Sequence, residues 1–123
     1  MSELRERIQE VIDNEPVTLF MKGTPRFVMC GNSDRALRAL RGAGAPVTGV
    51  DILPDPAIRQ ELSAISGWPT IPQVFVQGEL IGGADITEEL AASGELSRLL
   101  EEKLGSGYRD SAEIRTVSLL APA

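Results

Sequence analysis

Residues 17–52 predict a strand, a helix and a second strand, in that order. Residues 17–21 are rich in branched and aromatic side chains, as buried strands are. A helix is expected over about 31–41, where Gly42-Ala43-Gly44 would end it, and the next strand over 47–52. A strand, helix and strand in this order normally form a right-handed crossover between two parallel strands. The chain is therefore expected to be an α/β protein with a parallel pair of strands.

The remaining predicted elements lie on either side of this unit. Asp55 and Pro56 are suited to the N-cap and first position of a helix that Gly67 ends. Residues 74–77 and 79–81 flank Gly78 as an antiparallel hairpin. Amphipathic or short helices are expected over 4–12, 86–92 and 95–104. The prediction is a four-stranded mixed sheet, a parallel pair plus an antiparallel hairpin, flanked by helices.

The length of 123 residues indicates one folded domain with a C-terminal tail. The domain is expected to cover residues 1–104, and a Gly-Ser-Gly segment at 105–107 leads into a tail of residues 105–123. The apolar residues of the tail follow neither a strand nor a helix period. Both an edge strand and disorder remain open for it.

Composition excludes several kinds of function. The chain has one cysteine, Cys30, and no histidine, so it cannot form an internal disulfide, a Cys/His zinc site or a Cys–His catalytic pair. A net charge of -6 argues against nucleic acid or an anionic membrane as partner. No apolar run is long enough to span a bilayer. A single unpaired cysteine suits a reducing compartment, and the cytoplasm is the expected location.

Cys30 directly precedes the helix predicted from residue 31. A lone cysteine is more often a buried small hydrophobe than a reactive group. Here the exposed N–H groups of the helix start would stabilise a thiolate, and the charge of Lys22 across the loop could act in the same way. Gly31 and Ser33 are small and would leave the sulfur accessible. These neighbours favour a reactive thiolate, which without a second thiol could exchange only with a small thiol.

Five motifs occur in an order and spacing that resemble those of monothiol glutaredoxins, over roughly residues 1–103. They are Lys22-Gly23-Thr24-Pro25, Cys30-Gly31-Asn32-Ser33, Asp55-Pro56-Ala57-Ile58-Arg59, Trp68-Pro69-Thr70-Ile71-Pro72-Gln73 and Gly82-Gly83-Ala84-Asp85. The family has a thioredoxin-like fold, and this agrees with the predicted order of strands and helices. The resemblance implies glutathione as a ligand and a [2Fe–2S] cluster as a second one.

The resemblance also assigns roles within a glutathione groove. Cys30 would be both the redox-active thiol and the cluster ligand. Lys22 and Arg59 resemble the cationic clamp on the glycine carboxylate of glutathione, although each alone would be an ordinary solvated charge. Ile71 resembles the residue whose backbone pairs with the cysteine part of glutathione. Pro72 would then be a cis proline, which sequence alone would not predict.

The glycine-rich turn of the last motif completes this groove. Gly82 and Gly83 would let the backbone approach the ligand, and a helix start at Ala84 and Asp85 would bind the γ-glutamyl carboxylate and amine. An ordinary helix cap is the alternative interpretation of Asp85. Trp68 and Pro69 are expected in supporting roles.

Asn32 departs most from the family pattern, which has phenylalanine at this position. It removes an aromatic group beside Cys30 and adds a group that needs hydrogen bonds. Val28 replaces a usual proline, and Ala84 a usual cysteine or serine. These changes put the lifetime of a cluster or the geometry of a dimer in more doubt than glutathione binding.

Three functions remain as hypotheses. The first is a carrier in which a homodimer, or a heterodimer with a BolA-like protein, holds one [2Fe–2S] cluster through Cys30 and glutathione and delivers it to iron–sulfur apoproteins. A cluster needs four ligands, so two chains would supply two and two small thiols the others. The second is a glutathione-dependent thiol–disulfide oxidoreductase. The third is a binding domain without redox chemistry.

Overall fold

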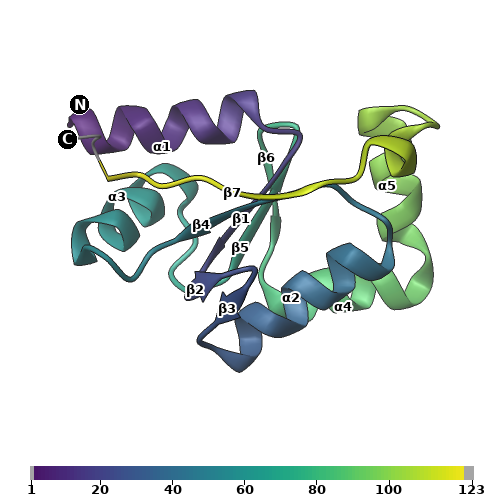
Figure 1. Cartoon of the computed structure of the whole chain (residues 1–123), viewed down its shortest axis with the longest axis horizontal. Helices are drawn as coiled ribbons and strands as arrows, with labels where there is room; N and C mark the ends of the chain where they lie inside the picture. Colours follow the sequence, from purple (N-terminus) through teal and green to yellow (C-terminus); the bar gives the residue numbers. More distant parts are fainter. Residues whose placement is uncertain (1, 121–123) are drawn as a thin grey trace.

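A mixed sheet runs through the centre of the structure, a computed structural model that describes residues 2–120 (Figure 1). Its strand order is β6-β5-β1-β4-β7. The central strand β1 pairs in parallel with β4 and antiparallel with β5, and β5 forms a hairpin with β6. The bounds are Val17–Met21 for β1, Val47–Asp51 for β4, Gln73–Val76 for β5, Glu79–Gly82 for β6 and Ile114–Thr116 for β7.

Helices cover both faces of this sheet. In Figure 1, α1 and α3 lie on one side, and α2, α4 and α5 on the other. Among the described residues, no helix is long and apolar enough to cross a membrane. The helices are α1 (Glu3–Asn14), α2 (Gly31–Gly42), α3 (Pro56–Ser66), α4 (Ala84–Ser93), α5 (Glu95–Leu104) and the short 3-10 helix η1 (Tyr108–Ser111).

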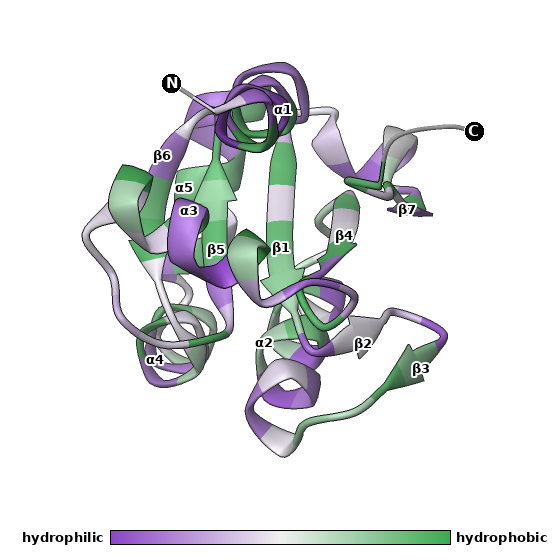
Figure 2. Cartoon of the chain, turned by 90° about the vertical axis from the view of Figure 1, so that its left-hand side faces the viewer, coloured by the Kyte–Doolittle hydropathy of each residue, from purple (hydrophilic) through white to green (hydrophobic). Residues whose placement is uncertain are grey.

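The central strand β1 contributes to the core on both of its faces. Its five residues are all buried, and all except Thr18 are apolar, in agreement with the mostly green colour of β1 in Figure 2. Leu19 packs into the cluster on the side of α2 and α5, while Phe20 faces α1 and α3. The ring of Phe20 meets that of Phe75 edge-on, with 5.7 Å between ring centroids. Such alternation follows from the two-residue period of a strand.

The thioredoxin-like α/β fold expected from the sequence is confirmed. Asp55 caps α3, because its side chain accepts a hydrogen bond from the N–H of Ala57, and Gly67 ends this helix in the left-handed conformation. Two local details differ. The segment expected as a loop over 22–29 contains a small hairpin of β2 (Gly23–Thr24) and β3 (Phe27–Val28). In addition, α4 begins at residue 84 and not at 86.

The expected count of four strands is wrong, because the C-terminal segment adds a fifth. Strand β7 pairs in parallel with the outer edge of β4. Only its backbone joins the sheet, since all three of its side chains are exposed, and no side-chain pattern marks it. On either side of β7, Tyr108 and Leu119 are buried in the two core clusters. The division of the chain at residues 104 and 105 stays a prediction.

Candidate functional site

Cys30 is the residue that immediately precedes α2. Its backbone is extended, so it occupies the N-cap position in front of the free N–H groups of the first helical turn. The N–H of Ser33 is the main group that lowers the pKa of Cys30. The N–H of Asn32, the Ser33 hydroxyl and the charge of Lys22 act in the same direction, against partial burial. Cys30 is a half-buried free thiol, and its thiolate is stabilised.

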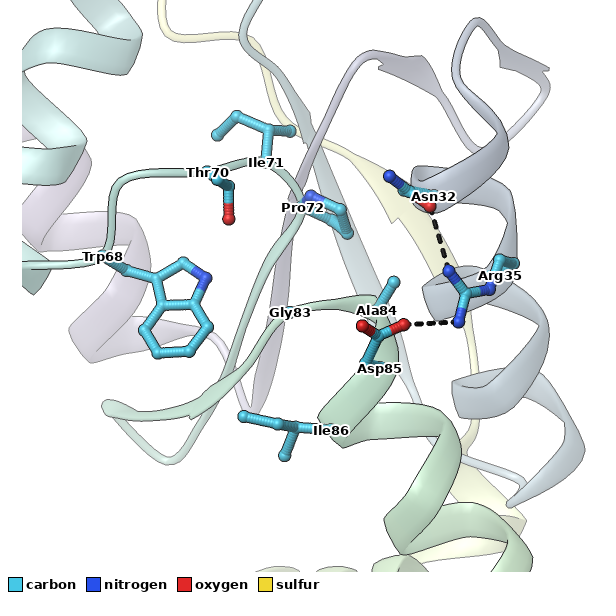
Figure 3. Close-up of a pocket in the computed structure, with 10 residues that line it drawn as sticks. All are labelled: Asn32, Arg35, Trp68, Thr70, Ile71, Pro72, Gly83, Ala84, Asp85 and Ile86. Atoms are coloured by element: carbon cyan, nitrogen blue, oxygen red, sulfur yellow. Dashed lines mark hydrogen bonds and ion pairs between the residues drawn. The ribbon is translucent and has the colours of Figure 1, made fainter.

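A groove with a volume of about 390 Å³ lies between the start of α2, the loop before β5 and the start of α4 (Figure 3). The peptide bond between Ile71 and Pro72 in this loop is cis. The groove is lined by Asn32, Arg35, Trp68, Thr70, Ile71, Pro72, Gly83, Ala84, Asp85 and Ile86. Three of the residues expected to bind a ligand, Ile71, Ala84 and Asp85, therefore meet in one groove.

The other predicted site residues lie around this groove and are not among its ten lining residues. The charge of Lys22 acts on the thiol of Cys30. Arg59 lies beside the loop that borders the groove, since its Nη2 donates a hydrogen bond to the carbonyl of Pro69 at 3.2 Å. The ligand contacts expected of Lys22 and Arg59 stay predictions.

Hydrogen bonds from two side chains hold the groove loop in place. The side chain of Gln73 is fully buried, and its Nε2 donates to the carbonyls of Trp68 at 2.9 Å and Thr70 at 3.2 Å. The hydroxyl of Ser63 on α3 donates to the same Trp68 carbonyl at 2.8 Å. The loop is thus connected to both β5 and α3, which gives the Ile71 backbone a defined position along the groove.

The opposite wall of the groove is the first turn of α4. Gly83 is its N-cap, and the hydroxyl of Thr87 donates to the carbonyl of Gly83 at 2.7 Å. A Cβ atom added to Gly83 would lie 3.2 Å from the carbonyl oxygen of Pro72 and 3.4 Å from the indole nitrogen of Trp68. The absence of a side chain at Gly83 therefore lets the two walls approach each other closely.

Arg35 is a groove residue that the sequence did not indicate. Its guanidinium contacts Asn32 on its own helix, and Asp85 and Glu88 on α4. Glu88, and after it Asp85, raise the pKa of Arg35, and Arg35 in turn lowers the pKa of Glu88. The spacing of Asn32 and Arg35 is one helical turn and could have suggested their contact. Nothing local indicates that α4 lies against them.

A family model described as Glutaredoxin matches residues 17–81, which is more than half of the chain. The chain belongs to the glutaredoxin family. With Cys30 as the only cysteine, it is a monothiol member. It is 46% identical over 102 residues to Glutaredoxin 4 of Escherichia coli K12, and the match covers 83% of this chain and 89% of that one. It is 44% identical over 104 residues to the mitochondrial Monothiol glutaredoxin-5 of Saccharomyces cerevisiae, covering 82% and 69%.

Solved structures of other glutaredoxins have the same fold. The solution structure of reduced apo GrxS14 from poplar matches with a TM-score of 0.74 and 41% identity, covering 84% of this glutaredoxin and 94% of that chain. The crystal structure of a buckwheat glutaredoxin–glutathione complex matches with a TM-score of 0.70 and 26% identity, covering 80% and 88%.

The single thiol of this glutaredoxin is not by itself a complete metal site. Within residues 2–120, no three His, Cys, Asp or Glu side chains lie together in a way that could hold a metal ion. Any metal or cluster bound through Cys30 would therefore take further ligands from a second chain or from small molecules.

Proposed function

We propose that this glutaredoxin binds glutathione in the groove beside Cys30 and, as a dimer, carries a [2Fe–2S] cluster for transfer or storage. The observation that carries the proposal is the position of Cys30. Cys30 is a half-buried thiol whose pKa the first turn of α2 lowers, and it stands two residues before Asn32, which lines the groove together with the cis Ile71–Pro72 peptide and the start of α4. The bound glutathione in the related buckwheat structure supports the choice of ligand.

The groove and the charged residues around it provide chemistry that suits each end of glutathione. The free N–H groups at Ala84 and Asp85 suit the γ-glutamyl carboxylate, since the start of a helix carries partial positive charge. The carboxylate of Asp85 suits the neighbouring ammonium group. The Ile71 backbone would pair with the cysteine part, and Lys22 and Arg59 would attract the glycine carboxylate. The thiol of glutathione would then lie beside that of Cys30.

The cluster is cargo in this proposal, and the ligand count decides how it is shared. A [2Fe–2S] cluster takes four thiolate-type ligands. Two copies of Cys30 and two glutathione thiols make four, so a homodimer would be sufficient. A BolA-like protein in place of the second copy, and iron–sulfur apoproteins as recipients in the cytoplasm, are the partners that this function implies.

Anaerobic reconstitution tests the carrier. The protein is incubated with iron, sulfide and glutathione, and its visible spectrum and mass in solution are recorded. We expect a coloured dimer that forms only when glutathione is present. Cys30→Ser should stay colourless and monomeric. A second control, Cys30→Ser combined with Ser106→Cys, keeps one thiol at an exposed position outside the groove and should also fail. A colourless wild-type monomer would contradict the proposal.

The stabilised thiolate of Cys30 also supports a second candidate, the removal of glutathione from glutathionylated proteins. The thiolate would attack the glutathione sulfur of the mixed disulfide and release the protein thiolate. A second glutathione thiolate would then attack the Cys30–glutathione disulfide, releasing oxidised glutathione and restoring Cys30. Turnover of a glutathionylated peptide by the cluster-free monomer would favour this function over the carrier.

A further inference from the structure

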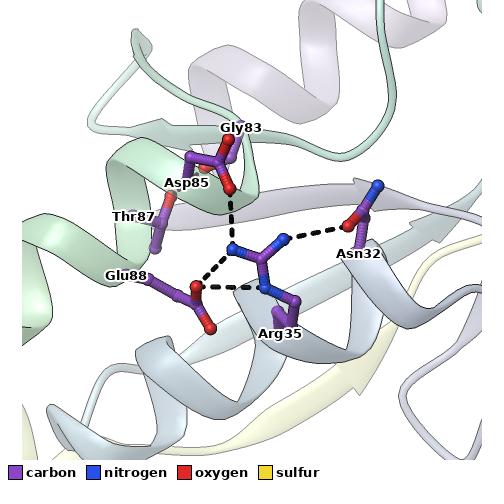
Figure 4. A network of polar contacts seen from close by, with 6 residues as sticks. All are labelled: Asn32, Arg35, Gly83, Asp85, Thr87 and Glu88. Carbon is purple, nitrogen blue, oxygen red and sulfur yellow. Dashed lines mark hydrogen bonds and ion pairs between the residues drawn. The ribbon is translucent and has the colours of Figure 1, made fainter.

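Arg35 connects two groove residues that come from different helices. Its Nη1 donates to the amide oxygen of Asn32 at 3.0 Å, and its Nη2 donates to Oδ1 of Asp85 at 2.7 Å. Its Nε donates to Oε1 of Glu88 at 3.0 Å, and Nη2 contacts the same carboxylate oxygen. Figure 4 shows the guanidinium between α2 and α4 with all three partners around it. The fork of an arginine is needed for such an arrangement, because an ammonium group has no fixed set of donors.

These contacts reduce the freedom of side chains that are otherwise exposed. The side chain of Asp85 is 82% exposed, so without a partner it would sample several rotamers at the mouth of the groove. Asn32 is also exposed. The Arg35 guanidinium is itself held by Glu88, which lies one turn behind Asp85 and does not line the groove. The result is one cation that sets the direction of two polar groups on opposite walls.

Asp85 and Asn32 each have one polar atom that Arg35 does not engage and that a ligand could contact. Within residues 2–120, the other oxygen of Asp85 and the amide nitrogen of Asn32 make no hydrogen bond with the protein. Figure 3 shows the Asn32 nitrogen on the side that faces Ile71 and Pro72. The net charge of this cluster also favours a cation. One guanidinium, that of Arg35, is shared by the carboxylates of Asp85 and Glu88, so the three side chains together carry a charge of -1. A ligand ammonium group is therefore attracted and not repelled.

We propose that Arg35 is a positioning residue that sets the ligand specificity of the groove. It holds Oδ1 of Asp85 so that the second oxygen receives the ammonium of a γ-glutamyl thiol. It also holds the Asn32 oxygen so that the amide nitrogen donates to a peptide carbonyl of the same thiol. The inference rests on the proposed binding of glutathione. It assigns a ligand contact to Asn32, the residue at which this chain departs from the family motif.

The test uses two probes that differ only in the ammonium group of the ligand. The first is S-methylglutathione, which binds without thiol exchange, and the second is the same molecule acetylated on its γ-glutamyl nitrogen. Trp68 is the only tryptophan of the chain and lines the groove, so its fluorescence reports binding of either probe to the full chain. The wild-type protein should prefer the first probe, because only this probe carries the ammonium group.

Arg35→Met should lower the affinity for S-methylglutathione by about 3- to 10-fold, since the binding of ligand must then immobilise two free side chains. It should lower the affinity for the acetylated probe less, so the preference falls. Arg35→Lys keeps the charge without the fork and should recover only part of the preference. Arg38→Met is the matched control, because Arg38 is an exposed arginine of the same helix that bonds Asp34 and does not line the groove. It should behave as wild type.

Asn32→Ala tests the proposed ligand contact of Asn32 independently. It should weaken both probes equally, by about 2- to 10-fold, because both retain the peptide carbonyl. The double variant Asn32→Ala with Arg35→Met should lose less binding free energy for S-methylglutathione than the sum of the losses in the two single variants. An unchanged preference in Arg35→Met, or tighter binding because Arg35 competes with the ammonium for Asp85, would overturn the inference. Failure of the wild-type protein to bind S-methylglutathione would instead overturn the proposed function and this inference with it.

Discussion

The hydroxyl of Ser33 accepts a hydrogen bond from the backbone N–H of Lys22 at 3.1 Å, which ties the first turn of α2 to the end of β1. Ser33 is fully buried, and both its N–H and its hydroxyl stabilise the thiolate of Cys30. A single side chain thus connects the core of the sheet to the thiol. This position explains why a small hydroxyl residue stands three residues after the cysteine.

Replacing Ser33 should affect both reactivity and stability. Ser33→Ala should raise the pKa of Cys30 only in part, because the main stabilising group is the Ser33 N–H, which remains. The free energy of unfolding should fall by about 1–2 kcal/mol, since the Lys22 N–H loses its acceptor. The pH dependence of iodoacetamide alkylation and urea unfolding measure the two effects. Ser106→Ala, at an exposed loop position, should change neither. An unchanged alkylation midpoint in a folded Ser33→Ala protein would contradict the first expectation.

The lowered pKa of Cys30 also makes stability depend on pH in a defined direction. In the window between the lowered pKa of the folded state and the ordinary thiol pKa of about 8.5, the unfolded chain binds a proton that the folded chain does not. Stability should therefore rise with pH through this window and be lost as pH falls through the pKa of the folded state. Urea unfolding at a series of pH values measures this slope, and Cys30→Ser should abolish it. A slope that persists in Cys30→Ser would assign the effect to another group.

Local sequence patterns predicted those parts of the molecule that depend on local physics. The burial of β1 follows from its five apolar or branched residues, and the cap of α3 follows from Asp55 followed by proline. The placement of Cys30 before a helix came from the same kind of pattern. These features depend on neighbours within a few residues, so the sequence was sufficient.

Features that depend on distant segments were not predicted, or were predicted only through the family resemblance. The cis peptide before Pro72 belongs to the second group, since an isolated Ile-Pro bond favours trans. The sequence does not decide between a strand and disorder for β7, because only its backbone pairs with β4 and its side chains follow no strand period. Arg35 was missed because its partner Asp85 is 50 residues away along the chain. Such contacts are determined by the packing of α2 against α4, which no local pattern describes.

The backbone conformation at Gly83 should allow an alanine, but the added methyl group should narrow the groove. Its φ of -99° is open to any residue, so Gly83→Ala should fold. The added Cβ would lie tightly against the Pro72 carbonyl and the Trp68 indole, which should narrow the groove and weaken S-methylglutathione binding by about tenfold. Gly42→Ala is the control, because within residues 2–120 a Cβ at this exposed position meets no atom within 4 Å beyond its chain neighbours and its own helix backbone. Equal binding by both variants would show that the close approach at Gly83 is not needed.

The C-terminal segment should stabilise the fold without acting on the thiol. The Tyr108 hydroxyl donates to the carbonyl of Ala43 at 2.8 Å in a buried position just beyond the end of α2. Tyr108→Phe leaves that carbonyl without this donor and should lower the free energy of unfolding by about 1–2 kcal/mol. Cys30 lies at the other end of the 12-residue helix, roughly 18 Å away along its axis, so its alkylation rate should stay unchanged. Arg109→Met removes the exposed cation over the Tyr108 ring and an exposed 3.4 Å hydrogen bond to the Ser97 hydroxyl, and its loss of unfolding free energy should be smaller than that of Tyr108→Phe. If Tyr108→Phe slowed alkylation, the tail would act on the site as well as on the fold.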